Sequence, residues 1–217
     1  MTANQAVLTG DLIASTQASP EAVDRAMAVL AAAADEIAGW RLTENTKVGD
    51  THFTRFRGDG WQIIVSLARF GLKAALLMYA RLAADPGLPL TRVAVGISTI
   101  DRISGPDLSD AYGAAFAVSG RALGEMERGE RLRADGHGVT PRDAALIALL
   151  NDRISDWSAE QAEAIAHVIA PDAPTQAAIA GRLGISPQAL SYRLTGARWP
   201  TLKRVLAAWE EPEEEMP

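Results

Sequence analysis

Two acidic residues in the first third of the chain have types and positions suited to metal binding. Asp11 lies near the end of the apolar run AVLTGDLI at residues 6–13, and Asp59 lies at the tip of a predicted hairpin, in RGDGW. If the strands that carry them are neighbours, both carboxylates meet at one edge of a sheet, where hard oxygen ligands can hold Mg²⁺ or Mn²⁺ and a nucleotide triphosphate. Alternatively each is a turn residue, because Asp is favoured in turns such as Gly-Asp-Gly.

A second candidate site lies near the C-terminus, where charge is unevenly distributed. Residues 173–209 contain five basic residues and no Asp or Glu, whereas residues 210–215 contain five Glu, within a net charge of -6 for the whole chain. A basic patch followed by an acidic tail is therefore hidden inside an acidic total. Such a patch is typical of a surface that contacts nucleic acid.

The stretch TQAAIAGRLGISPQALSYRL has the spacing of two helices packed across a tight turn. Its apolar residues recur at helical intervals, Gly184 stands in the turn, and Ser186 with Pro187 starts the second helix. The segment resembles the helix-turn-helix of bacterial transcription regulators, and the alternative is a helical hairpin that packs on the first domain. If it binds DNA, we expect base contacts from Gln188, Ser191 and Tyr192, and phosphate contacts from Thr175, Ser186, Arg193, Arg198, Lys203 and Arg204.

The composition excludes several other classes of protein. The chain has 217 residues, 48% of them hydrophobic and 22% charged, which is globular composition. It has no cysteine and only three histidines, so disulfides and thiolate zinc sites are excluded and any metal must be held by carboxylates. Neither a membrane-spanning run nor a signal peptide is visible, so we expect a cytoplasmic protein without a membrane partner.

The elements that position these residues follow from periodicity and turn signals. We expect strands at 6–13, 52–57, 61–66 and 90–98, and helices at 20–39, 67–84 and 111–128. The order β-α-β-β-α-β is that of a ferredoxin-like unit. Residues 129–139 form a final strand or a linker, and helices follow at 141–157, 159–170, 175–183, 187–195 and 202–209. The prediction is an α+β chain: a ferredoxin-like domain at 1–138, an all-α helix-turn-helix domain at 139–209 and an acidic tail at 210–217.

The motifs of the first domain resemble class III nucleotidyl cyclases. The segment DLIAST that begins at Asp11 looks like their first metal motif, and RGDGW around Asp59 looks like the second and like the hairpin of GGDEF-type palm domains. The resemblance implies a nucleotide site in which both acids hold the metal and Ser15 and Thr16 lie in the loop that receives phosphates.

The same resemblance assigns three further residues. Arg55 stands at the purine-reading position, four residues before the second acid, where cyclases have lysine. Asp110 matches a base-selecting acid and Arg121 a phosphate-binding arginine; alternatively Asp110 is a helix N-cap and Arg121 a surface arginine. Where cyclases have an asparagine that holds the reacting groups, this chain has Ala117, so the resemblance implies binding rather than turnover.

The order of GDLIAST, RGDGWQ, RVAVGIS and GAAFAVSGRAL, followed by the helix-turn-helix, is similar to the SatD family of bacterial proteins over nearly the whole chain. We therefore predict a DNA-binding transcriptional regulator whose degenerate cyclase-like domain binds a nucleotide and modulates the helix-turn-helix. Since cyclase sites form at a two-fold interface and helix-turn-helix modules read paired half-sites, a homodimer is expected. The alternative is an active metal-dependent nucleotidyl cyclase or nucleotidyltransferase that makes a signalling nucleotide.

Overall fold

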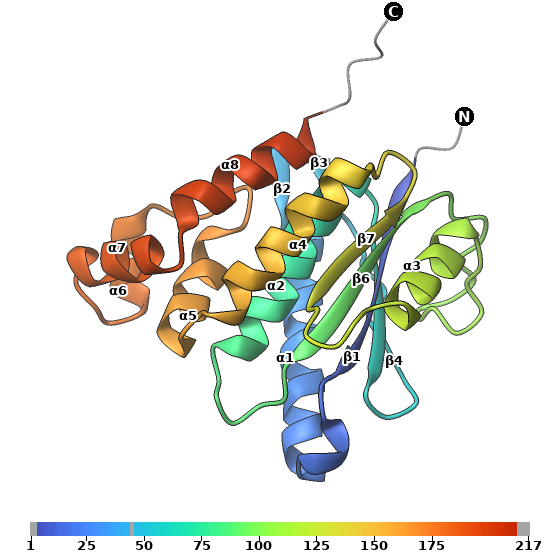
Figure 1. The fold of residues 1–217 in the computed structure, drawn as a ribbon, viewed down its shortest axis with the longest axis horizontal. Helices are drawn as coiled ribbons and strands as arrows, with labels where there is room; N and C mark the ends of the chain where they lie inside the picture. The colour runs from blue at the N-terminus through green and yellow to red at the C-terminus, as the bar shows by residue number, and fades with distance from the viewer. Residues whose placement is uncertain (1–3, 44–45, 212–217) are drawn as a thin grey trace, which may run out of the picture.

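The computed structural model describes residues 4–43 and 46–211, and the fold within them is of the predicted α+β class (Figure 1). The main sheet consists of β1 (Gln5–Leu12), β4 (Thr54–Phe56), β5 (Gly60–Val65), β6 (Thr91–Ser98) and β7 (Leu132–Gly136), and β2 (Arg41–Thr43) pairs separately with β3 (Thr46–Lys47). The helices are α1 (Pro20–Gly39), α2 (Gly71–Ala83), α3 (Ala114–Gly124), α4 (Pro141–Ser155), α5 (Ala159–Val168), α6 (Gln176–Arg182), α7 (Pro187–Gly196) and α8 (Trp199–Glu210). Glu213, Glu214 and Glu215 of the expected acidic tail lie outside the described residues.

The strand order of the main sheet is β4-β5-β1-β6-β7. β1 is central and runs antiparallel to both β5 and β6, while β7 is parallel to β6 at one edge. Residues 129–139, for which a strand or a linker was expected, therefore contribute the edge strand β7. The N-terminal end of α1 also forms as its sequence indicates, because Ser19 accepts a hydrogen bond from the Ala22 amide and Pro20 occupies the first turn.

The two faces of the sheet are covered by different helices (Figure 1). Ala6 and Leu8 of β1 point to the large core beneath α1 and α2, whereas Val7 packs with Ile64 and Ala115 of α3 on the other face. This is the period-2 alternation of a strand that is buried on both sides.

Gly96 allows α3 to approach the sheet closely. A Cβ atom at this position would lie 2.4 Å from the Ser119 amide nitrogen and 2.6 Å from the Ala115 carbonyl oxygen. Ser119 in turn shares a 2.8 Å hydrogen bond with the Thr9 hydroxyl of β1, and this hydroxyl also accepts one from Gln62. The backbone of α3 thus rests on β6 where no side chain separates them.

The C-terminal helices share the large core with the sheet. Tyr79 of α2 packs at 6.2 Å from the ring of Trp157, and buried residues of α4, α5, α7 and α8 belong to the same apolar cluster as those of α1 and α2. Burial raises the pKa of Tyr79. None of the helices in the described ranges is both long and apolar enough to cross a membrane.

Asn151 of α4 binds the start of the free edge of β7. Its side-chain oxygen accepts hydrogen bonds from the Arg131 and Leu132 amides, at 2.9 and 2.8 Å, and its side-chain nitrogen donates to the Leu132 carbonyl. A buried asparagine thereby satisfies backbone groups at the start of this edge that would otherwise be unpaired.

Candidate functional site

Asp11 is held by an arginine of the neighbouring strand. The register places Asp11 opposite Arg92 of β6, and the guanidinium donates to both carboxylate oxygens, at 2.9 and 2.5 Å. The hydrogen bond to Asp11 is the main cause that raises the pKa of Arg92. A divalent cation at Asp11 would therefore have to displace a bidentate guanidinium.

The loop that follows β1 presents free backbone donors. Ala14 adopts the left-handed conformation, with φ of 53°, and Ser15–Gln17 then form a short 3-10 turn. The amides of Ala14, Ser15 and Thr16 donate to no acceptor within residues 4–43 and 46–211, whereas those of Ile13 and Gln17 are bonded. Successive amides around a left-handed residue form a concave site for anions, and a strained alanine is often associated with function.

Asp59 fastens this loop to the hairpin. Its carboxylate accepts a 2.5 Å hydrogen bond from the Ser15 hydroxyl, and its carbonyl accepts one from the Leu12 amide. Asp59, Ser15 and Thr16 line a hollow of about 550 Å³ together with Arg55 and Arg57.

The two expected metal ligands line different hollows. Asp11 and Arg92 line a second hollow, of about 560 Å³, with Arg128 and Arg131. Within the part of the chain that the structure describes, no three acidic or histidine side chains form a metal-binding group. The β1–β5 pairing thus brings the backbones of the two acids together, but in this arrangement Arg92 and Ser15 occupy their carboxylates.

Arg55 of β4 bonds to groups within the chain. Its guanidinium donates to the Gly58 carbonyl at 2.6 Å and to Asp24 of α1 at 2.8 Å, so it ties the hairpin turn to the first helix. Arg57, which follows on the turn with φ of 52°, is exposed at the rim of the same hollow.

Asp110 and Arg121 lie away from both hollows. The alternative that Asp110 caps α3 is wrong, because α3 begins at Ala114 and its N-cap is Gly113. Arg121 pairs with Asp135 of β7 at 2.9 Å, and this hydrogen bond lowers the pKa of Asp135. Neither residue lines the hollows beside the loop at Ala14–Thr16.

Sequence reasoning missed the arginines Arg92, Arg128 and Arg131. Arg92 begins the quoted strand segment RVAVGIS, but its role depends on the pairing of β6 with β1, which no local pattern reveals. Arg131 has no ion-pair partner among the described residues, and its Nε atom is buried without a hydrogen bond. Arg128 and Arg131 pair with no acid among the described residues, so they make this end of the sheet a better environment for an anion than for a metal ion.

The second candidate site is the unit formed by α6 and α7. Thr175 and Ser186 cap the two helices by accepting from the Ala178 and Ala189 amides, and Gly184 takes φ of 65° in the turn between them. Ile179, Ala180, Leu190 and Leu194 are buried between the helices and their neighbours. Gln188 and Ser191 are exposed, and Tyr192 is 80% exposed, so this face of α7 is free for contact.

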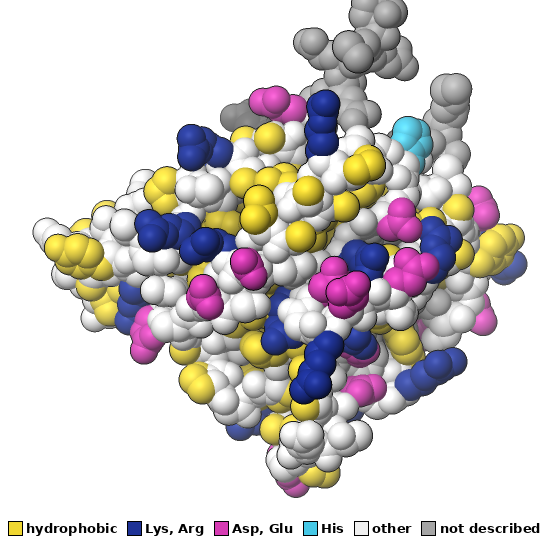
Figure 2. Space-filling view, in the orientation of Figure 1, with side chains coloured by type: hydrophobic (Ala, Val, Ile, Leu, Met, Phe, Trp, Pro, Cys, Tyr) yellow, Lys and Arg dark blue, Asp and Glu magenta, His cyan; other side chains and the backbone are white. Residues whose placement is uncertain are grey.

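The basic residues that were expected to contact phosphate fall into two groups. Arg198, Lys203 and Arg204 are exposed and make no ion pair with any residue that the structure describes. Arg193 is partly buried and pairs with Glu163 of α5 at 2.7 Å. Figure 2 shows Lys and Arg side chains over α8 and its junction with α7. Of the four cations expected to bind phosphate, three are unpaired among the described residues and one, Arg193, already pairs with Glu163.

Known proteins share only a weak structural likeness with this chain. No family model matches the chain, and no curated protein matches it. A solved structure, described as the crystal structure of the guanylyl cyclase Cya2, is 18% identical and covers 58% of this chain and 72% of its own, with a TM-score of 0.37. A likeness of this strength defines neither a fold nor an activity.

Proposed function

We propose that the chain is a DNA-binding regulator that contacts DNA through α6 and α7. The observation that carries the proposal is the exposed outer face of α7, with Gln188, Ser191 and Tyr192, beside the free cations of α8 and its start. Side chains of these types on a capped helix can contact base edges, while nearby cations contact phosphates. Arg193 contributes less to this surface, since Glu163 neutralises it.

We further propose that the sheet forms a ferredoxin-like, palm-type domain that binds a nucleotide. The strand order β4-β5-β1-β6 with its antiparallel neighbours supports the fold assignment. The free amides of Ala14, Ser15 and Thr16, between hollows that contain arginines, support phosphate binding at the loop. Similarity to the SatD family and the homodimer remain predictions, as does the cytoplasmic location.

A Mg²⁺ or Mn²⁺ ion does not fit between Asp11 and Asp59 as they are arranged here. Arg92 holds one carboxylate and Ser15 the other, and the two acids line separate hollows. The proposed chemistry is therefore anion binding by amides and guanidinium groups. Nucleotide occupancy would regulate DNA binding by favouring one arrangement of the sheet and helices over another.

DNA binding is tested by fluorescence anisotropy with genomic fragments and the variant Tyr192→Ala. Tyr112→Ala is a matched control, because Tyr112 is also exposed, at 56%, but lies in the loop before α3. We expect the α7 variant to weaken binding by about tenfold and the control to bind like the wild type. Absence of binding by the wild type, or equal loss in both variants, would contradict the proposal.

Nucleotide binding is tested separately by mass spectrometry of a nucleotide mixture incubated with the protein, with free and retained fractions analysed apart. The variant Arg128→Gln is compared with Arg102→Gln, because both arginines are exposed but only Arg128 lines the hollow beside the loop. We expect an unchanged nucleotide to be retained by the wild type and the control, and to be lost in Arg128→Gln. A new nucleotide in the free fraction would instead indicate the enzymatic alternative.

A further inference from the structure

Four residues of α4 form a stripe with opposite charges at its ends. Arg142, Ala145, Leu149 and Asp152 follow one another at intervals of three, four and three residues, so they share one face of the helix. All four are exposed, and Leu149, at 68%, is the most exposed large aliphatic side chain among the described residues. Neither Arg142 nor Asp152 has an ion-pair partner in that part of the chain.

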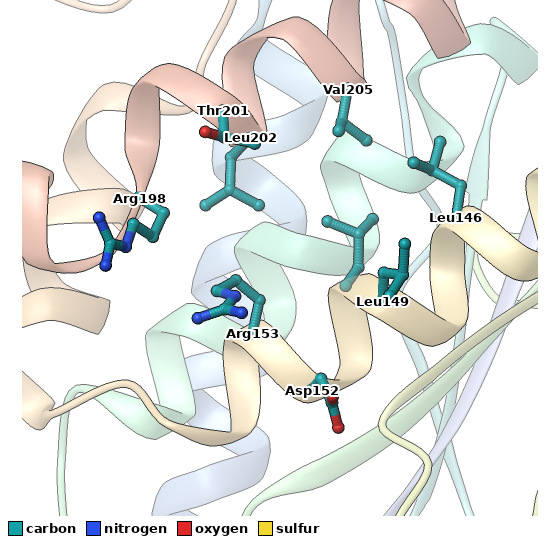
Figure 3. Close-up of a pocket in the computed structure, with 9 residues that line it drawn as sticks. Leu146, Leu149, Asp152, Arg153, Arg198, Thr201, Leu202 and Val205 are labelled. Atoms are coloured by element: carbon teal, nitrogen blue, oxygen red, sulfur yellow. The ribbon is translucent and has the colours of Figure 1, made fainter.

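An apolar groove runs beside this stripe, between α4 and α8. It has a volume of about 490 Å³ and is lined by Leu146, Leu149 and Leu150 from α4 and by Leu202 and Val205 from α8. Figure 3 shows these aliphatic side chains between the two helices, with Arg153 and Arg198 at one end. Figure 2 shows hydrophobic side chains gathered over the same strip of surface. A monomer thus leaves an apolar helix face and a groove open to solvent.

The stripe complements a second copy of itself that runs in the opposite direction. Arg142 lies five residues before Ile147 and Asp152 five residues after it, while Ala145 and Leu149 lie two before and two after. Two copies of α4 can pack antiparallel through the stripe, about a two-fold axis at the height of Ile147, whose own side chain is buried on the opposite face of the helix. Each Arg142 then lies opposite Asp152 of the other copy. Each Leu149 then lies opposite the small Ala145, beside the groove of the other copy. Parallel packing would instead place like charges together.

We propose that this face of α4, with the α4–α8 groove, is the interface of a two-fold symmetric homodimer. An isologous interface requires a patch that complements itself, and this stripe does so in both charge and side-chain size. A second copy is favoured over an unrelated helix because α4 itself supplies both partners of each pair, the opposite charges and the large and small side chains. The proposal rests on α4 and α8 alone and does not depend on the proposed binding of DNA or nucleotide.

Charge reversal tests the proposal through the mass of the protein in solution. The variants Arg142→Asp and Asp152→Arg each place like charges opposite one another at both ends of the interface. Both changes suit the helix dipole, since the acid lies near the start of α4 and the base near its end, so the helix itself is preserved. Arg102→Asp makes the same charge change on the loop after β6 and is the control.

Sedimentation velocity at concentrations from roughly 1 to 100 μM should show a dimer for the wild type and the control. Each reversed variant should dimerise about thirtyfold more weakly, because two attractive contacts become repulsive. An equal mixture of the two variants should recover the dimer, since one copy then carries two acidic ends and the other two basic ends. A monomeric wild type, or reversed variants that dimerise as well alone as when mixed, would overturn the proposal. DNA and nucleotide binding are measured separately, so their outcome does not affect this one.

Discussion

The salt dependence of DNA binding gives a quantitative test of the α7–α8 surface. Arg198, Lys203 and Arg204 are exposed and unpaired within the described residues, whereas Arg193 is held by Glu163. Each phosphate that a cation neutralises releases counterions, which contributes about -0.9 to the slope of log K against log salt. Counting only the three free cations that are expected to contact phosphate, the predicted slope is about -2.7 for each recognition unit. Raising the salt from about 50 to 200 mM should then weaken binding by about fortyfold.

Single substitutions identify which cations are responsible for the salt dependence of DNA binding. Fluorescence anisotropy with a labelled duplex of arbitrary sequence should show that Lys203→Ala or Arg204→Ala makes the slope shallower by about 0.9. Arg193→Gln should leave the slope nearly unchanged, because Glu163 already neutralises this arginine. A salt-independent affinity, or a slope that depends on Arg193 and not on Lys203 or Arg204, would refute the reasoning.

Three further predictions concern the framework that positions the sites. Asn151→Ala should lower the free energy of unfolding by about 2–4 kcal/mol in urea titrations, because the buried edge of β7 loses its partners; an unchanged midpoint would contradict this role. Gly96→Ala should cost about 3 kcal/mol in the same assay, since its Cβ would collide with the backbone of α3; a neutral effect would exclude the close approach. Burial lowers the pKa of His167 below its ordinary 6.5, so the unfolded chain binds the proton more readily and stability falls as the pH drops below that value. Urea titrations at several pH values should show that the free energy of unfolding falls more in the wild type than in His167→Gln as the pH drops. An equal pH dependence in the two proteins would contradict this role of His167.

The elements governed by local signals were predicted well. Helix α1 has the predicted bounds and cap because Ser19 and Pro20 act within one turn, and the turn at Gly184 follows from a single left-handed residue. Helix α2 begins at Gly71 rather than at residue 67, because residues 68–70 form a 3-10 turn. Helix α3 begins after Gly113, whose φ of 155° lies outside the helical region, so the first turn starts later than the apolar pattern indicates.

The candidate sites depend on contacts between residues far apart in the sequence, and these could not be predicted. Asp11 is neutralised by Arg92, 81 positions away, because of the register of β1 and β6. Arg193 is neutralised by Glu163 through the packing of α5 against α7. The residue types of both sites were visible in the sequence, but which charges remain free is decided by tertiary packing.

Selection from a random duplex library shows whether the exposed face of α7 reads DNA. The wild-type protein should enrich a defined sequence motif, Tyr192→Ala should change or abolish that motif, and Tyr112→Ala should retain it. If the wild type enriches no sequence, or if Tyr192→Ala enriches the same motif as the wild type, α7 does not read DNA and the account is wrong.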